Sequence, residues 1–253
     1  MQIEAKTVVV TGAGRGIGRA IALHFAALKA NLALLDVNAG DLERTRAACA
    51  ALGITARVYT VNVAAETEVN RTMAAVAQDF GRFDVLVNNA GIIRDGLLIK
   101  AKDGIVADKL SLEKWQAVID VNLTGVFLCG REAAEQMIKS GSGGVIINIS
   151  SISRHGNAGQ TNYSAAKAGV AAMTVVWARE LARFGIRAGT IAPGFIQTEI
   201  LAAMKPEILA GVLASVPLHR PGKPEEVAQA AQFIVDNDLF TGRCIDLDGG
   251  LRI

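Results

Sequence analysis

Short runs of apolar residues, rich in β-branched side chains, recur along the chain. They read TVVVTG (7–12), NLALLDV (31–37), ARVYTVNV (56–63), DVLVNNAG (84–91), GVIINISS (144–151), IRAGTIAPG (186–194) and RCIDLDGG (243–250). These runs are nearly continuously hydrophobic and do not alternate with polar residues, as is typical of strands covered on both faces of a sheet. We therefore predict seven buried strands.

The segments between these runs carry apolar residues at helical spacing together with good helix formers. The predicted helices cover residues 17–29, 40–53, 65–80, 111–139, 161–184 and 223–237. Strands that alternate with helices form βαβ crossovers and a parallel sheet. The expected fold is one α/β domain over residues 1–253, a doubly wound seven-stranded parallel sheet with helices on both faces.

The first departure from this alternation is a proline-rich segment. All five prolines of the chain lie between Pro193 and Pro224. Because proline interrupts regular helices and strands, the segment at about 194–222 is an irregular excursion and not a compact crossover. We expect it to form a lid over a substrate site.

The second departure lies at about 97–110, where Asp103 and Gly104 separate two short alternating runs. An Asp-Gly pair in this position predicts a two-residue β-hairpin turn. The segment follows the fourth strand, so it leaves the carboxyl edge of the sheet, where ligands bind in such folds. We expect the hairpin to border the substrate entrance, with a contact between subunits as the alternative.

Composition limits the classes of function. The 26 basic and 24 acidic residues are scattered, which argues against a nucleic-acid surface. The three cysteines lack CxxC spacing and the three histidines lack metal spacing, so we expect neither a disulfide nor a metal site. No signal peptide is apparent, and no run approaches the ~20 apolar residues that span a bilayer. We expect a cytoplasmic protein without membrane or nucleic-acid partners.

The first predicted strand runs directly into TGAGRGIG, residues 11–18, and then into a helix. Gly12, Gly16 and Gly18 let the backbone turn tightly and approach a pyrophosphate, which would rest on the amides of the helix that begins near Ile17. The strand before the loop and the helix after it supply the context that such a loop requires. The sequence therefore predicts a dinucleotide site.

Tyr163, one of only two tyrosines in the chain, precedes Lys167 by four residues. Residues at this spacing share a helix face, with about 6 Å between their Cβ atoms. A phenol has an ordinary pKa of about 10, and a neighbouring positive charge favours the phenolate. Tyr163 is therefore a candidate acid/base. The alternative is a helix that carries a tyrosine and a lysine on one face without a chemical role.

Further motifs occur along the chain. They are NNAG (88–91), Asn122 in DVNLTG, NISS (148–151), YSAAK (163–167), APG (192–194) and a terminal DGG. Together with the T-G-x-x-x-G-x-G spacing of the glycine loop, they resemble the short-chain dehydrogenase/reductase family over essentially the full length. Within that family, GNAGQTNYSAAKAGV and GKPEEVA are most similar to the 3-oxoacyl-acyl-carrier-protein reductases. The resemblance implies a Rossmann fold, a nicotinamide cofactor and a ketone or secondary alcohol as substrate.

The resemblance also implies a role for each polar residue of the site. Tyr163 would protonate a carbonyl during reduction or deprotonate an alcohol during oxidation. Lys167 would lower the pKa of Tyr163 and hold the nicotinamide ribose. Asn122 would anchor a water that links Lys167 to solvent, and a serine after the fifth strand would orient the substrate oxygen.

Two serines compete for that last role. The usual spacing from the tyrosine points to Ser150, whereas counting along the strand points to Ser151. A strand buried on both faces holds its register more firmly than a surface loop resists a deletion. We therefore favour Ser151, with a one-residue deletion in the loop before Tyr163.

Asp36 ends the second strand about 20 residues after the glycines, where a carboxylate binds the adenosine ribose of NAD. Its alternative role, capping the next helix, falls more naturally to Asn38 or Asp41. Arg15 opposes this interpretation, since a guanidinium there can meet the 2′-phosphate of NADP or pair with Asp36. We expect NAD to be preferred over NADP. The residues expected to bind the cofactor are Gly12, Arg15, Gly16, Ile17, Gly18, Asp36, Asn62, Val63, Asn89, Ala90, Gly91, Tyr163, Lys167, Pro193, Gly194, Ile196 and Thr198.

The leading hypothesis is an oxidoreductase that interconverts a ketone and a secondary alcohol by hydride transfer, with a 3-oxoacyl thioester as one candidate substrate. The alternative is a non-catalytic dinucleotide-binding scaffold or redox sensor, which would be free to lose the acid/base residues that are present here. An acyl-carrier protein would require a basic patch, for which Arg154, Lys205 and Arg220 are the candidates. A free small ketone or alcohol fits equally well.

We also expect a homotetramer, partly because of the family resemblance. The helices predicted at 111–139 and 161–184 offer more apolar surface than one sheet face covers, so symmetry mates are expected to pack there. The hairpin at about 97–110 resembles an insertion relative to the acyl-carrier-protein reductases.

Overall fold

The centre of the molecule is a parallel sheet of seven strands in the order β3-β2-β1-β4-β7-β8-β9. The computed structural model describes residues 1–202 and 206–251. The strands are β1 (Thr7–Thr11), β2 (Asn31–Asp36), β3 (Ala56–Thr60), β4 (Val85–Asn88), β7 (Gly144–Ile149), β8 (Ile186–Pro193) and β9 (Arg243–Leu247). The strand order reverses direction between β1 and β4, as in doubly wound folds. The predicted parallel sheet and its strands are confirmed.

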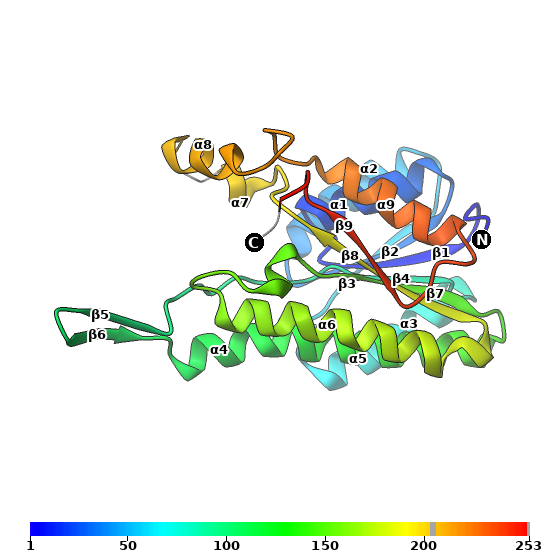
Figure 1. Ribbon diagram of the computed structural model, residues 1–253. Helices are drawn as coiled ribbons and strands as arrows, with labels where there is room; N and C mark the ends of the chain where they lie inside the picture. The colour runs from blue at the N-terminus through cyan, green and yellow to red at the C-terminus, as the bar shows by residue number, and fades with distance from the viewer. Residues whose placement is uncertain (203–205, 252–253) are drawn as a thin grey trace.

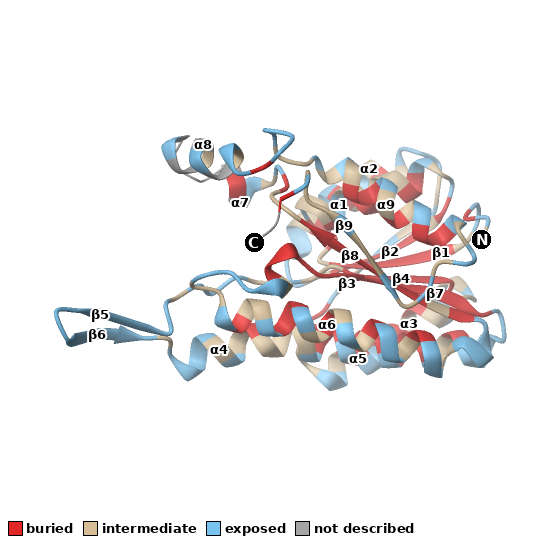
Figure 2. Ribbon diagram, in the orientation of Figure 1, coloured by how far each residue is buried: buried red, intermediate tan, exposed pale blue. Residues whose placement is uncertain are grey.

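Helices cover both faces of the sheet (Figure 1). One layer contains α1 (Gly16–Ala27), α2 (Ala39–Ala50) and α9 (Pro224–Asp236), and the other contains α3 (Glu66–Phe80), α4 (Leu112–Ile119), α5 (Gly125–Ser140) and α6 (Thr161–Glu180). Val8 and Val10 of β1 pack into the first layer and Val9 into the second. Because both faces are covered, the central strands are buried throughout, which explains their continuous hydrophobicity (Figure 2).

The predicted helix at 111–139 is not regular. A π-helical turn over Asp120–Thr124 separates α4 from α5. Such turns insert one extra residue and often occur at functional positions. Asn122 lies in this turn and is completely buried. Hydrophobic periodicity alone did not reveal the change of helix type.

Other helix ends agree with the prediction to within a few residues, except at the end of the predicted helix 161–184. There α6 stops at Glu180, and a 3-10 turn over Ala182–Phe184 follows. No helix within the described residues combines the length and hydrophobicity that a membrane crossing requires.

The proline-rich segment after β8 contains two short helices, α7 (Glu199–Ala202) and α8 (Pro206–Ala214). They lie beyond the carboxyl end of β8, apart from the main helical layers (Figure 1). Lys205, one of the expected basic residues, lies outside the described residues. The segment thus stands over the edge of the sheet where the motif residues gather.

The segment after β4 contains an antiparallel hairpin of β5 (Ile99–Lys102) and β6 (Ile105–Lys109). Asp103 and Gly104 both have positive φ angles, of 52° and 79°, as a two-residue hairpin turn of the primed type requires. The hairpin projects beyond the ends of the helices, and both strands are exposed throughout (Figures 1 and 2).

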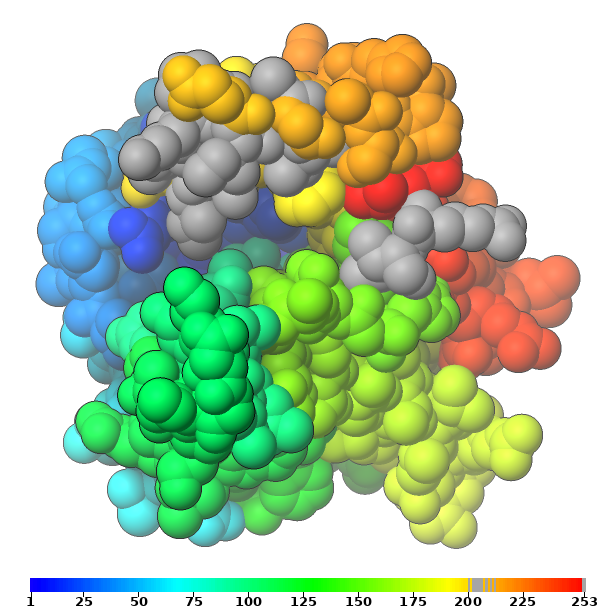
Figure 3. Space-filling view, turned by 60° about the vertical axis from the view of Figure 1, so that its left-hand side comes forward, coloured from blue at the N-terminus to red at the C-terminus, as the bar shows by residue number. Residues whose placement is uncertain are grey.

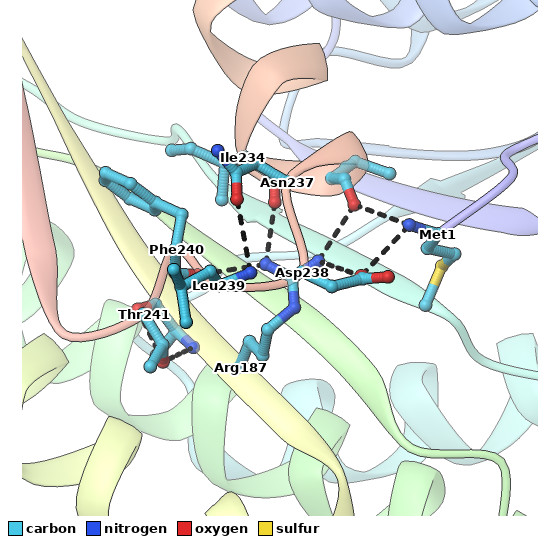
Figure 4. A network of polar contacts seen from close by, with 10 residues as sticks. Met1, Arg187, Ile234, Asn237, Asp238, Leu239, Phe240 and Thr241 are labelled. Carbon is cyan, nitrogen blue, oxygen red and sulfur yellow. Dashed lines mark hydrogen bonds and ion pairs between the residues drawn. The ribbon is translucent and has the colours of Figure 1, made fainter.

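At the start of β8, Arg187 fastens the sheet to the end of α9 (Figure 4). Its guanidinium donates hydrogen bonds to the carbonyl oxygens of Ile234, Val235 and Phe240 at 2.7 to 3.0 Å and pairs with Asp238 at 3.3 Å. These carbonyls belong to the helix end and the turn after it, and those at a helix end have no partner within the helix. Arg187 therefore braces the fold at the edge opposite the carboxyl ends of the strands.

Candidate active site

The glycine loop after β1 requires glycine for steric reasons. Gly12 and Gly16 have positive φ angles of 64° and 54°. A Cβ atom at Gly12 would come within 2.9 Å of the Cα of Ala90, and one at Gly18 within 2.1 Å of the carbonyl oxygen of Gly12. No side chain of the described residues caps α1 at Arg15, so the first amides of the helix stay available to an anion. The loop therefore fits the pyrophosphate of a dinucleotide.

The loop after β4 is pinned to the glycine loop. The Thr11 hydroxyl accepts hydrogen bonds from the backbone amides of Asn89 and Ala90, each at 3.0 Å. The Asn89 side chain donates to the carbonyl oxygens of Thr11 and Gly12, each at 3.1 Å. The Asn89 amide, which we expected to bind the cofactor, therefore holds the shape of the site through these contacts.

Asp36 is fixed beside the glycine loop. Its Oδ2 accepts from the Gly14 amide at 3.0 Å and its Oδ1 from the Asn38 amide at 3.1 Å. The cap of α2 is Asn38, whose side chain accepts from the amide of Asp41 at 3.1 Å. As expected, Asp36 does not cap the helix, and its carboxylate lies beside the glycine loop.

Arg15 does not pair with Asp36, which was one of its two expected roles. Its Nη1 lies 3.5 Å from Oε2 of Glu199, the first residue of α7, and both side chains are largely exposed. The neighbouring Thr198 approaches the same loop, since its Cγ2 would lie 3.6 Å from a Cβ at Gly16. This ion pair therefore connects the glycine loop with the segment that follows β8.

The remaining residues expected to bind the cofactor lie after strands β3, β4 and β8 and in the first turn of α1. Asn62 and Val63 come after β3, and Ile17 lies in the first turn of α1. Pro193 ends β8, and the amide of the next residue, Gly194, donates to the carbonyl of Leu247 at 2.9 Å. The carboxyl ends of parallel strands meet at one edge, so these positions share that edge with the glycine loop. Ala90 and Gly91 follow β4, and Ile196 is buried beyond β8.

Tyr163 and Lys167 lie one turn apart at the start of α6, as predicted. The Nζ of Lys167 donates to the carbonyl oxygen of Ile149 at 2.8 Å and lies 5.6 Å from the centre of the Tyr163 ring. Lys167 is buried, and burial lowers its pKa to about 8. Its charge is therefore easily lost just above neutral pH.

The two candidate serines point to different partners. The hydroxyl of Ser151 accepts from the amide of Ser153 at 3.1 Å and lies near enough to the Tyr163 phenol to lower its pKa by hydrogen bonding. The hydroxyl of Ser150 donates to the carbonyl oxygen of Lys167 at 2.7 Å and is buried. This geometry favours Ser151 as the residue beside the acid/base and gives Ser150 a structural role.

Burial raises the pKa of Tyr163, the hydrogen bond with Ser151 lowers it, and the charge of Asp95 raises it further. The net direction is upward. In the structure burial outweighs the opposing effect of Ser151, and the expected lowering of this pKa by Lys167 stays a prediction. The structure therefore holds Tyr163 in the protonated form that can donate a proton.

Both polar atoms of the Asn122 side-chain amide are hydrogen-bonded to the main chain of Ile92. Its Oδ1 accepts from the Ile92 amide at 2.8 Å, and its Nδ2 donates to the Ile92 carbonyl at 2.9 Å. The π-helical turn supports this geometry by carrying the buried Asn122 side chain toward the loop after β4. Through its side chain, Asn122 fixes this loop.

Sequence reasoning missed Asn162, the residue before the candidate acid/base. Its Oδ1 accepts from the Tyr163 amide at 2.8 Å, and its Nδ2 donates to the carbonyl oxygens of Arg94 and Lys114 at 3.0 and 3.1 Å. It is completely buried. The available signal was an asparagine, a poor helix former, in the first turn of a helix.

The two described residues of the expected basic patch are both paired with carboxylates. Arg154 binds Asp246 at 2.6 Å, and its side chain is only 11% exposed. Arg220 binds Glu226 through both guanidinium ends at 2.7 and 2.9 Å. These two candidates are therefore already paired within the chain, and whether they contribute to a basic patch stays a prediction.

Figure 3 looks onto the end of the molecule at which the hairpin and the segment after β8 project. The surface is hollowed between these two segments, and blue atoms of the N-terminal part of the chain are visible in the depth of the hollow (Figure 3). The hairpin and the segment with α7 and α8 therefore flank the approach to the carboxyl edge of the sheet.

Comparison with known proteins gives concordant matches. The protein family described as enoyl-(acyl carrier protein) reductase matches residues 12–252. The chain is 41% identical to the 3-oxoacyl-[acyl-carrier-protein] reductase FabG of Thermotoga maritima over 100% of both chains. It is 42% identical to the 3-oxoacyl-[acyl-carrier-protein] reductase of Synechocystis over 98% of both chains. It is 41% identical to that of Staphylococcus aureus over 97% of this chain and 98% of the relative.

Proposed function

Since the chain belongs to the short-chain dehydrogenase/reductase family, and is therefore an oxidoreductase of ketones and secondary alcohols, we propose that it reduces a 3-oxoacyl thioester with NADH. The observation that carries this proposal is the position of the Tyr163 phenol. It lies near enough to Ser151 for that hydroxyl to lower its pKa, and it is one helical turn from the buried Lys167, whose Nζ is 5.6 Å from the ring centre. Ser151, Tyr163 and Lys167 lie at the carboxyl edge of the sheet, next to the glycine loop that fits a dinucleotide.

The residues of the chain divide the binding of the cofactor among them. Gly12, Gly16 and the open N-terminus of α1 accommodate the pyrophosphate, and Asp36 accepts hydrogen bonds from the adenosine ribose. Lys167 holds the nicotinamide ribose. When bound, the nicotinamide supplies the hydride that reduces the carbonyl carbon of the substrate.

Proton transfer belongs to Tyr163. As the carbonyl π bond breaks, the phenol gives its proton to the carbonyl oxygen, so the product is a secondary alcohol. Ser151 donates a hydrogen bond to the same oxygen and stabilises its developing negative charge. Lys167 then stabilises the phenolate until solvent restores the proton. Asn122 fixes the loop after β4. By the family resemblance it also anchors the water that links Lys167 to solvent.

The choice of NAD over NADP rests on two contacts. Asp36 is held in place by two backbone amides, so its charge cannot swing away from a 2′-phosphate. Arg15, the cation that would compensate that phosphate, is paired with Glu199. We therefore propose NAD as the preferred cofactor.

The substrate proposal follows the names of the relatives, which are 3-oxoacyl-[acyl-carrier-protein] reductases. One observation favours a second candidate, a free small ketone. Arg154 and Arg220, the described candidates for contact with an acidic acyl-carrier protein, are already paired with Asp246 and Glu226. The acyl-carrier protein thus remains one candidate partner beside free small molecules.

We also propose a cytoplasmic homotetramer. Large apolar side chains on the outer faces of α5 and α6 support it, since Phe127, Val175 and Val176 are 41%, 40% and 48% exposed. These helices form the layer in which symmetry mates would pack.

The test is a steady-state assay of ketones and alcohols with NADH and with NADPH. The panel contains 3-oxoacyl groups on acyl-carrier protein and on a short thiol, together with small free ketones. We expect reduction of 3-oxoacyl thioesters with NADH. Binding of dinucleotide without turnover of any carbonyl compound would instead favour the non-catalytic scaffold.

A further inference from the structure

Asn162 lies in the first turn of α6 and is completely buried. The first amides of a helix have no acceptor within the helix. The side chain of Gln160, the residue before α6, is bonded to Asp95 and does not cap the helix. Instead, Oδ1 of Asn162 accepts from the amide of Tyr163 at 2.8 Å. The main chain of the candidate acid/base is therefore held by the side chain of the residue before it.

The nitrogen end of the same side-chain amide reaches two other segments. Nδ2 of Asn162 donates to the carbonyl oxygen of Arg94, in the loop after β4, at 3.0 Å and to that of Lys114, in the first turn of α4, at 3.1 Å. These residues precede Asn162 by 68 and 48 positions. A side-chain amide has two N–H donors, so both are used. One buried side chain thus joins the start of α6, the loop after β4 and α4.

The loop after β4 is held at two further points. Asn122 bonds both main-chain polar atoms of Ile92, and the amide of Gly96 donates to the carbonyl oxygen of Gly159 at 2.8 Å. The contact made by Asn162 lies between these two points in the sequence. The loop is therefore fixed against α6 as well as against the π-helical turn.

The beginning of this loop belongs to the proposed cofactor site. The amides of Asn89 and Ala90 are bonded to the hydroxyl of Thr11, at the start of the glycine loop. The loop after β4 therefore connects the glycine loop with the main chain of Tyr163. Asn162 is the side chain that makes this connection beside the acid/base itself.

We propose that Asn162 is a positioning residue, which holds the start of α6 against the loop after β4 so that the Tyr163 phenol and the bound nicotinamide meet the same carbonyl group. Such alignment matters because a misplacement of ~1 Å can lower a rate by about 100-fold. The proposal rests on the proposed function, in which Tyr163 is the acid. It assigns a role to a residue outside the group of Asn122, Ser151, Tyr163 and Lys167.

The alternative role of Asn162 is a local helix cap without influence on the reaction. Asparagine is a common capping residue because its oxygen satisfies an amide of the first turn. A cap requires only Oδ1, whereas the two bonds made by Nδ2 lead to other segments. The two roles therefore differ in what they predict for variants that keep an oxygen and lose the amide nitrogen.

The first variant, Asn162→Leu, removes all three bonds and has a side chain of similar size. With saturating NADH we expect kcat for ketone reduction to fall by roughly ten- to hundred-fold. The dissociation constant for NADH should stay close to the native value, since the glycine loop and Asp36 are unchanged. An undiminished kcat would overturn the proposal.

Asn162→Ser separates positioning from capping, and it also serves if Asn162→Leu does not fold. Serine can cap the first turn of a helix, but its single hydroxyl donor cannot replace two N–H groups. Positioning predicts that kcat falls in this variant as well. A native kcat in Asn162→Ser would reduce Asn162 to a cap and overturn the proposal.

Arg187→Met is the matched control for loss of stability. Arg187 also donates to main-chain carbonyls of other segments, but at the opposite edge of the sheet. The variant should lower the midpoint of thermal unfolding and leave kcat unchanged at a temperature at which circular dichroism finds all variants folded. An equal fall of kcat in Arg187→Met and Asn162→Leu would overturn the proposal, since the effect would then follow stability.

A double-mutant cycle tests whether Asn162 acts through Tyr163. In the Tyr163→Phe background the acid is already absent, so Asn162→Leu should lower the remaining rate much less than it lowers the native rate. Residues that act as a unit show such non-additive effects. Equal factors in the two backgrounds would contradict an action on the phenol.

Amide hydrogen exchange separates this proposal from the proposed function, because it requires no substrate. The Gly96 amide, which is bonded to Gly159, reports whether the loop stays against the start of α6. Its exchange should be roughly tenfold faster in Asn162→Leu, and near the native rate in Arg187→Met. An unchanged rate in Asn162→Leu would overturn the proposal even if no ketone is reduced. Faster exchange in a protein that reduces no carbonyl compound would support the connection made by Asn162 and contradict the proposed function alone.

Discussion

The Ser151 hydroxyl lies near enough to the Tyr163 phenol to lower its pKa by hydrogen bonding, although the two residues belong to different elements of the fold. Ser150, one position earlier, donates to the main chain of α6 at Lys167. Both serines follow the end of β7, where the backbone of Ser151 is extended. Successive side chains of an extended chain point to opposite sides, so we expect only one of the two to face the phenol.

This contrast predicts unequal effects of two alanine substitutions. Ser151→Ala should lower kcat for ketone reduction by roughly ten- to thousand-fold, because it removes a donor to the reacting oxygen. Ser150→Ala should have a much smaller effect on kcat and act on stability, since its hydroxyl bonds a buried carbonyl. Steady-state kinetics and thermal unfolding of both variants check this ranking. The reverse ranking of the kcat values would assign the role to Ser150.

Cofactor preference should depend on Asp36. At about 4 Å, two like unit charges repel by ~4 kcal/mol at an effective dielectric constant of 20, so a 2′-phosphate near this carboxylate is disfavoured. We expect NADH to be preferred at least tenfold in kcat/KM, for which ~1.4 kcal/mol is sufficient. Replacing Asp36 by Ala and Val37 by Arg should reverse the preference, since Val37 directly follows Asp36 and is 67% exposed.

A single substitution tests the contribution of Arg15 to cofactor preference. Glu199→Gln removes the carboxylate that pairs with Arg15. The freed guanidinium should improve the kcat/KM for NADPH by a few-fold, since exposed ion pairs contribute ~0.2–1 kcal/mol, with little change for NADH. Equal efficiency of the native protein with the two cofactors would contradict the role given to Asp36.

The hairpin should influence substrate entry. The loop at the base of the hairpin is held at Gly96, whose amide donates to the carbonyl oxygen of Gly159. The hairpin also flanks the hollow of Figure 3. Replacing residues 100–109 by a Gly-Ser link should change KM for the carbonyl substrate by roughly threefold or more, equivalent to ~0.6 kcal/mol. Light scattering should find an unchanged assembly. An altered assembly with normal kinetics would identify the hairpin as a subunit contact.

The buried ammonium group of Lys167 should lower the free energy of unfolding. Burial lowers its pKa from the ordinary 10.5 to about 8, so the folded protein binds this proton less tightly than the unfolded chain. The penalty is ~3 kcal/mol at neutral pH. Lys167→Met removes it, loses a hydrogen bond of ~1 kcal/mol, and should raise the free energy of unfolding by ~2 kcal/mol while activity is lost.

The sign of this effect fixes its pH dependence. Because the folded-state pKa of this lysine is lowered, the penalty is fully present below pH 8 and disappears as the pH rises toward 10.5. The stability gained by Lys167→Met should therefore be largest at neutral pH and shrink through this interval. Denaturant unfolding at several pH values measures it, and a gain that grows between pH 8 and 10.5 would disagree with a buried ammonium.

The sequence predicted the sheet and the main helices because burial on both faces leaves a continuous hydrophobic pattern, as in β1. It also located Tyr163 and Lys167, whose pairing depends only on local helical spacing. The π-helical turn at Asn122 escaped prediction, because hydrophobic periodicity does not distinguish it from an α-helix and its side chain bonds Ile92, which is 30 residues away.

Charge partners were equally out of reach. Arg15 meets Glu199, which is 184 residues away in the sequence. Arg154 is nearly buried and paired with Asp246, so its side chain is less available to an acyl-carrier protein than the sequence suggested. The pKa of Tyr163 could not be predicted from the neighbouring lysine because burial, which acts in the opposite direction, is a property of the tertiary structure.

The most direct test of the central claim is the activity of Tyr163→Phe with saturating NADH. The substitution removes only the hydroxyl that gives its proton to the substrate, and loss of general-acid catalysis typically costs roughly 10²–10⁴-fold in rate. We predict a loss of kcat of that size, with the dissociation constant for NADH almost unchanged in a fluorescence titration. A variant that keeps a tenth of the native rate would show that Tyr163 is not the acid.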